Sequence, residues 1–212
     1  MSNTTVKLNY INQSNDANNS EIVIFQKNVV ATYDEIAIAW KVIKNCGFGS
    51  NHPFDFPLAL QVAASDSWGN YTPKLDAYPG DQFAMVRNTS GDVLQFNGPA
   101  NSSEEVEVLN MLPRGAIDAC IYRNGKLLAQ KTNVAPQQMA AFKFKPSIWV
   151  GVVSQIEEGQ VMDSAILSAV MSTVDSLLIA ASAAAARSSM GPSSTYHRAS
   201  IGVSSWEDKP RT

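Results

Sequence analysis

The stretch GAIDACIYRNGKLLAQKTNVAP, from Gly115 to Pro136, decides the fold class. Its segments Asp118 to Arg123 and Lys126 to Thr132 are rich in residues that suit β-strands, and Asn124-Gly125 stands between them. A two-residue hairpin turn of type I′ needs positive φ at both central positions, which Asn tolerates and Gly accepts freely. The stretch therefore predicts two antiparallel strands joined by a tight turn.

Short apolar segments of the same kind recur along most of the chain, with turn-forming residues between them at roughly ten-residue spacing. We expect strands at Val6 to Tyr10, in EIVIFQKN, at 37–43, 58–64, 82–87, 93–96 and 105–109, and in AAFKFKP and SIWVGVVSQ. TSGD, at 89–92, is typical of a second hairpin turn. No alternation of strands and helices and no internal repeat interrupts this rhythm. It predicts an all-β fold, an antiparallel β-sandwich.

The C-terminal part has a different period. Ile166, Val170, Val174 and Leu178 recur every four residues, which predicts one helix near 163–186. Whether this segment instead adds a strand stays open, because β-branched residues are frequent in it. Residues 188–212 show little periodicity, so we expect a flexible tail after a single domain spanning 1–187.

Composition limits the partners and the compartment. The 212-residue chain has a net charge of -3 and a pI of about 5.4, which argues against nucleic acid as a partner. We expect neither a signal peptide nor a transmembrane span. A cytoplasmic protein is predicted, with unconventional export left open. Cys46 and Cys120 are then expected to be reduced and buried, although the sequence leaves open whether they pair.

Few residues suggest catalysis. His52 stands in GSNHPFDFP, a turn-like stretch, and His197 lies in the expected tail, so a metal site with several imidazole ligands is not predicted. Motifs of nucleophilic elbows and nucleotide-binding loops do not occur. In SSEEVEV, Glu105 and Glu107 are expected on a solvated strand face, with paired catalytic carboxylates as the alternative. We therefore predict no catalytic residue, no metal and no cofactor.

The stretch ASDSWGNYTPKL is the strongest candidate for a binding site. Asp66, Trp68, Asn70 and Tyr71 surround a glycine in what is expected to be a loop between strands. An aromatic ring beside carboxylate and amide groups suits a sugar or a lipid headgroup, and the same oxygens suit calcium. The alternative is that Trp68 packs over the end of a sheet while Asp66 and Asn70 hydrogen-bond their own turn.

Several stretches together carry a resemblance to a known family: EIVIFQKN, AWKVIKNCG, HPFDFPL, SDSWGNYTP and the long run from Gly115 to Met162. Over roughly residues 5–165 the chain resembles a family of small, uncharacterised microbial proteins, some of which carry the label of aromatic ring-opening dioxygenase. The resemblance implies iron chemistry. Intradiol enzymes hold iron with two Tyr and two His, and extradiol enzymes with two His and a Glu, whereas this chain has only His52 and His197.

Two functions follow from these expectations. The first is a non-enzymatic β-sandwich that binds a carbohydrate, a lipid headgroup or a protein, in a lectin-like or membrane-binding manner, or that self-associates as a homo-oligomer. The second is a metal-dependent aromatic ring-opening dioxygenase.

Overall fold

The computed structural model describes residues 5–13, 21–30, 37–66, 68–162 and 200–201, and these residues form an all-β structure without a helix. The expected all-β class, with several antiparallel sheets, is confirmed. The helix predicted near 163–186 lies outside the described residues. Within the described part, no helix is long and apolar enough to span a membrane.

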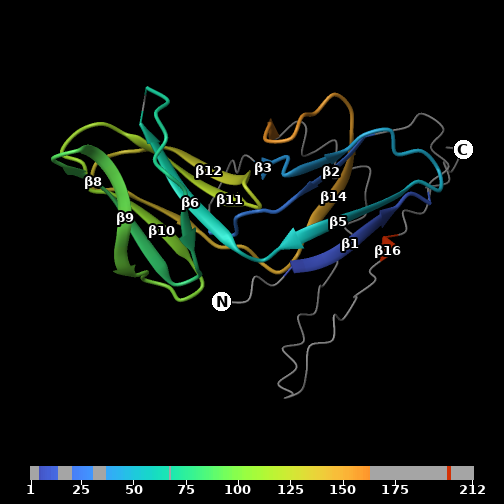
Figure 1. Cartoon of the computed structure of the whole chain (residues 1–212), viewed down its shortest axis with the longest axis horizontal. Coiled ribbons are helices and arrows are strands. Elements are labelled where there is room, and N and C mark those ends of the chain that lie inside the picture. The colour runs from blue at the N-terminus through green and yellow to red at the C-terminus, as the bar shows by residue number, and fades with distance from the viewer. Residues whose placement is uncertain (1–4, 14–20, 31–36, 67, 163–199, 202–212) are drawn as a thin grey trace, which may run out of the picture.

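The described strands form five sheets. Two of them, in the green and yellow half of Figure 1, lie beside the blue strands of the other half. The two four-stranded sheets have the spatial orders β13 (Met139–Phe142), β10 (Val106–Asn110), β8 (Asp81–Asn88), β9 (Gly91–Pro99) and β12 (Lys126–Val134), β11 (Ile117–Arg123), β6 (Leu60–Asp66), β7 (Leu75–Ala77). The two three-stranded sheets have the orders β16 (Ser200–Ile201), β1 (Thr5–Ile11), β5 (Asn51–Pro57) and β14 (Trp149–Val153), β2 (Glu21–Phe25), β4 (Lys41–Ile43). The fifth sheet pairs β15 (Val161–Met162) with β3 (Ala37–Ile38).

The hairpin predicted at Asn124-Gly125 is confirmed. Strands β11 and β12 pair antiparallel up to Arg123 opposite Lys126, and φ is 52° at Asn124 and 74° at Gly125. Both central residues therefore have the positive φ that a type I′ turn requires. The second predicted hairpin is also present, because β8 and β9 pair as far as Asn88 opposite Gly91.

Strand β5 corrects the interpretation of GSNHPFDFP as a turn. It pairs antiparallel with β1 along its whole length, and His52 lies opposite Tyr10. Proline is tolerated here because β5 is an edge strand in the described part of its sheet, where a missing N–H interrupts no second ladder. The signal that was overlooked is the alternation of buried Phe54 and Phe56 with exposed Asp55.

Strand β10 departs from the expected pattern in two ways. It pairs in parallel with β8, so the sheet that contains it is mixed. It is also buried on both faces: Val106 and Val108 lie in the core, and Glu107 is fully buried too. The expectation of a solvated face at Glu107 was therefore wrong, because the segment around Asn101 covers that face and binds the carboxylate.

The core is shared by several sheets. A large cluster joins residues from both halves of the structure, from Leu8 and Tyr10 to Phe142 and Ile148. Strand β2 is buried on both sides, since Ile22 and Ile24 belong to this cluster while Val23 and Phe25 pack in a smaller one with β3 and β15. Burial on both faces explains why this strand is a continuous apolar run.

Two residues of the expected C-terminal tail take part in a sheet. Ser200 and Ile201 pair in parallel with Asn9 and Tyr10 of β1. The remainder of the segments 163–187 and 188–212 lies outside the described residues.

Candidate functional site

The four residues predicted to bind a ligand lie together where the chain leaves β6. The Asp66 carboxylate holds this loop: its Oδ1 accepts hydrogen bonds from the backbone N–H of Trp68 and of Asn70, both at 2.9 Å. Its Oδ2 accepts a third from Asn70 Nδ2, also at 2.9 Å. Main-chain bonds between Asp66 and Asn70, and between Gly69 N and Asp66 O, close the loop. The expected bonding of Asp66 and Asn70 to their own turn is thus present.

The hydrogen bonds fix the charge of Asp66. The Asn70 side chain, then the Asn70 backbone N–H, lower the pKa of this carboxyl below its ordinary value, with smaller help from Trp68 and Gly69 and against a small opposing effect of burial. Asp66 is therefore ionised well into the acidic range. The loop is built around a carboxylate that is negatively charged at neutral pH.

The two aromatic rings of the loop face solvent. Trp68 is 88% exposed and Tyr71 is 60% exposed. Trp68 therefore does not pack over the end of a sheet, which was the alternative for that residue. Gly69, with φ of 83°, lets the chain reverse immediately after Trp68, and Tyr71 then pairs with Ser65 in an isolated antiparallel bridge.

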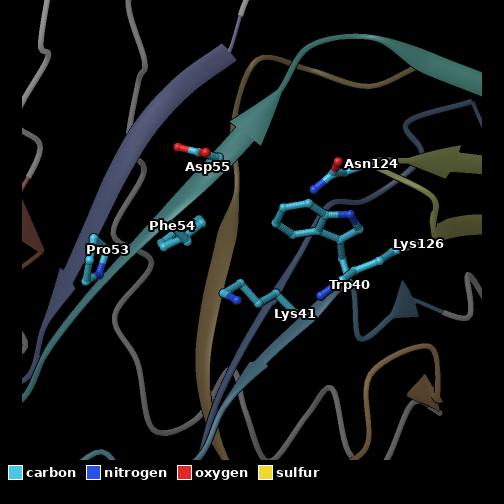
Figure 2. A pocket seen from close by; sticks show the side chains of 7 residues that line it. All are labelled: Trp40, Lys41, Pro53, Phe54, Asp55, Asn124 and Lys126. Atoms are coloured by element: carbon cyan, nitrogen blue, oxygen red, sulfur yellow. The ribbon is translucent and has the colours of Figure 1, made fainter.

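A separate hollow, which we call the Lys41 pocket, lies between the Asn124-Gly125 turn and strands β4 and β5 (Figure 2). Its volume is about 450 Å³, within the usual range for small-ligand sites. Seven residues line it: Trp40, Lys41, Pro53, Phe54, Asp55, Asn124 and Lys126.

Aromatic contacts and one hydrogen bond from a side chain to the main chain hold the Lys41 pocket in shape. Trp40 Nε1 donates to the carbonyl oxygen of Arg123 at 3.0 Å, which ties the segment after β3 to the end of β11. The Trp40 ring meets Phe56 edge-on at a centroid distance of 5.2 Å. Trp40 is buried, and no local sequence pattern indicates that its neighbours form a hollow.

Metal and cysteine chemistry find little support in the described part of the chain. No group of three or more His, Cys, Asp or Glu side chains is placed there to hold a metal ion. The half-buried His52 has a buried Nε2 that meets no protein hydrogen-bond partner, and His197 lies outside the described residues. Cys46 and Cys120 are both buried, and no disulfide joins them, which answers the question of their pairing.

Comparison of the chain with protein-family models, with curated proteins and with solved structures finds no match.

Proposed function

We propose that this chain is a non-enzymatic β-sandwich protein that binds carbohydrate through the loop from Asp66 to Tyr71. The observation that carries the proposal is the exposure of Trp68, at 88%, on a loop held by three hydrogen bonds to one carboxylate. A large apolar ring gains free energy when a partner removes it from water, so the indole on this hydrogen-bonded loop offers a contact surface to such a partner.

Sugar is the partner class that best suits the groups beside the ring. Pyranose rings stack on aromatic faces through their C–H bonds, while their hydroxyls need acceptors and donors at the rim. The Asp66 carboxylate has room for more than the three hydrogen bonds it accepts in the loop, because two carboxylate oxygens offer about four lone-pair sites. The side-chain amide of Asn70 donates from Nδ2 to Asp66, so its side-chain oxygen Oδ1 is directed elsewhere and can accept a hydrogen bond from a ligand.

Charge disfavours an anionic membrane as the partner. The chain carries a net charge of -3, and the loop itself is built on the ionised Asp66. Binding to anionic lipid headgroups gains about 1 kcal/mol per basic residue near the surface, and the loop offers no basic residue for this.

A glycan array followed by calorimetric titration of the best hit tests the proposal. Trp68→Ala is expected to weaken binding about 5- to 30-fold, since stacking of one aromatic ring contributes about 1–2 kcal/mol. Phe48→Ala is the matched control, because Phe48 is also a strongly exposed aromatic, at 70%, but lies in the turn before β5. The affinity of the Phe48→Ala variant for the glycan is expected to equal that of the wild type.

Two further measurements separate the other partner classes. Pelleting with neutral and anionic phospholipid vesicles would reveal lipid binding, and light scattering against concentration would reveal self-association. The carbohydrate proposal would be wrong if the wild type bound no glycan and instead bound lipid or self-associated in a way that Trp68→Ala abolished.

A further inference from the structure

The charges around the Lys41 pocket are not balanced within the protein. Lys41 projects its Nζ toward the Phe54 ring, 5.9 Å from its centre, and no carboxylate of the described residues lies within ion-pair distance of it. Figure 2 shows its side chain running along the pocket beneath the Trp40 indole. An ammonium group that lies against an apolar wall, with no carboxylate in ion-pair contact, attracts anions.

Lys126, the second cation of the wall, is already neutralised. Its Nζ lies 2.6 Å from Glu158 Oε2, and Glu158 Oε1 accepts from the backbone N–H of Val42 at 3.2 Å. Burial alone would raise the pKa of Glu158, but these two hydrogen bonds and the positive charges of Lys126 and Lys41 outweigh burial and lower that pKa. The ion pair therefore persists at neutral pH and fixes one side of the pocket.

Arg123 adds a second uncompensated charge behind the wall. It is 5% exposed, and its guanidinium carbon lies 4.4 Å from the centre of the Phe56 ring. Its buried Nε has no protein acceptor, and no carboxylate of the described residues pairs with it. Burial lowers its pKa to about 10, so it stays cationic at neutral pH. Fields from such a charge reach farther than they would in water.

One negative charge on the opposite wall limits the ligand. Asp55 lines the pocket and is exposed. The charges of Lys126 and Glu158 cancel each other, which leaves the positive charges of Lys41 and Arg123. The Asp55 carboxylate offsets one of these two, so the net charge is about one positive charge. A monoanion fits this balance better than a phosphate dianion does.

We propose that the Lys41 pocket binds a small organic monocarboxylate, with Lys41 donating to the carboxylate and the Phe54 and Trp40 rings contacting its apolar part. The Asn124 side chain, which Figure 2 shows beside the Trp40 indole, supplies an amide donor on the far side. Hydrogen bonds from an ammonium to a carboxylate are about twice as strong as neutral ones. This site is distinct from the Asp66 loop, so either binding proposal can prove wrong without affecting the other.

Titration of the ¹⁵N-labelled full chain with benzoate, followed by NMR, tests the site. Weak binding, with a Kd of about 1 mM, is expected, because a ligand of this size makes few contacts. The largest shifts are expected at the Asn124 side-chain amide, the Gly125 backbone amide and the Trp40 indole N–H. Shifts centred on other residues would overturn the proposal.

Three variants decide which charges matter. Lys41→Met, which keeps the chain length against Phe54, is expected to raise the Kd about tenfold. Lys44→Met removes the same charge three residues away, where Lys44 pairs with Glu157 at 2.7 Å outside the pocket, and is expected to leave the Kd within about twofold of wild type. Asp55→Asn is expected to tighten binding about twofold by removing a repelling charge.

Two further results would overturn the proposal. The first is a benzoate Kd that Lys41→Met and Lys44→Met change equally, since that pattern reports net charge and not a site. The second is stronger binding of inorganic phosphate or of benzylammonium than of benzoate at the same amides. A native-like spectrum of each variant shows that a change in Kd does not come from unfolding.

Discussion

The guanidinium of Arg123 stacks on Phe56 in the interior of the protein, 4.4 Å from the ring centre, with no carboxylate partner among the described residues. A cation over an aromatic face gains about 1–2 kcal/mol when it is desolvated. Removing the guanidinium from water costs several kcal/mol, so the stacking does not compensate fully. Arg123 therefore lowers the stability of the fold that contains it.

Replacing Arg123 with Met is expected to raise the free energy of unfolding by about 1 kcal/mol, because Met fills similar space without a charge. Urea unfolding at neutral pH measures this. Arg114→Met, which removes the same charge from an exposed position, is the control and should change nothing. If the Lys41 pocket binds carboxylates, Arg123→Met should also weaken benzoate binding, so that stability and affinity move in opposite directions.

The effect of Arg123 has a defined pH dependence. Its pKa in the folded protein is about 10, below the ordinary value of an arginine, so between these values the unfolded chain binds the proton more tightly than the folded one. Folding stability then rises with pH in this window. The gain in the free energy of unfolding that Arg123→Met gives over wild type is therefore complete below about pH 10 and should shrink above it. An advantage that grew with alkaline pH would contradict the assignment of a buried, unpaired guanidinium.

Glu107 is the opposite case, a buried carboxyl group whose hydrogen-bond partners are all provided by neighbours. Gln82 Nε2 donates to its Oε2 at 2.7 Å, and the backbone N–H and Nδ2 of Asn101 donate to Oε1 at 2.9 and 3.0 Å. Glu107→Gln would turn one acceptor into a donor that faces other donors. We expect a loss of about 2–3 kcal/mol in the free energy of unfolding, measured in urea. Glu105→Gln, two residues earlier and less buried, should leave the unfolding midpoint unchanged.

Local chemistry made much of the fold predictable. The Asn124-Gly125 turn was predictable because its positive φ values are a property of those two residues. Strand β5 was missed because Pro53 and Pro57 are turn formers in isolation, and only the position of the strand at a sheet edge makes them acceptable. Whether a proline lies at an edge depends on the tertiary arrangement.

The two candidate sites also differ in whether local sequence or the tertiary arrangement brings their residues together. Asp66, Trp68, Asn70 and Tyr71 are neighbours in sequence, so one loop brings them together and a local pattern suggested them. The Lys41 pocket joins segments that are 83 residues apart where Trp40 bonds to Arg123, and no periodicity links such distant segments. Glu107 was misplaced for a related reason, since alternation along a strand assigns faces but does not show what covers them.

Cys120 is expected to be chemically inert. Burial raises the pKa of this thiol to about 11, a shift that the hydrogen bond with Tyr122 reduces and the negative charge of Asp118 increases. At about pH 8 only about one molecule in a thousand then carries the reactive thiolate. In a Cys46→Ala variant, where Cys120 is the sole cysteine, labelling by an aromatic disulfide reagent should be slow and should become fast in denaturant. Labelling of the native protein as fast as that of free cysteine would contradict this.

The charge of Asp66 should depend on one neighbour above all. Asn70 provides both a side-chain and a backbone donor to the carboxylate, which together lower its pKa below the ordinary 3.8. Asn70→Ala removes the side-chain donor, so the Asp66 pKa, measured from carboxyl ¹³C shifts, should rise toward the ordinary value. Tyr71→Phe, a change in the same loop that removes no bond to Asp66, should leave it unchanged.

The sign of the pH effect on the loop follows from the direction of that shift. A carboxyl whose pKa is lowered by folding stabilises the folded form fully above the ordinary value, and this stabilisation is lost as the pH falls below about 3.8 toward the lowered value. The backbone amides of Trp68 and Asn70, which donate to Asp66, should therefore lose hydrogen-exchange protection in that range, before the core does. In Asn70→Ala the loss should begin at higher pH. An unchanged onset in that variant would show that the loop is held by something other than the Asp66 carboxylate.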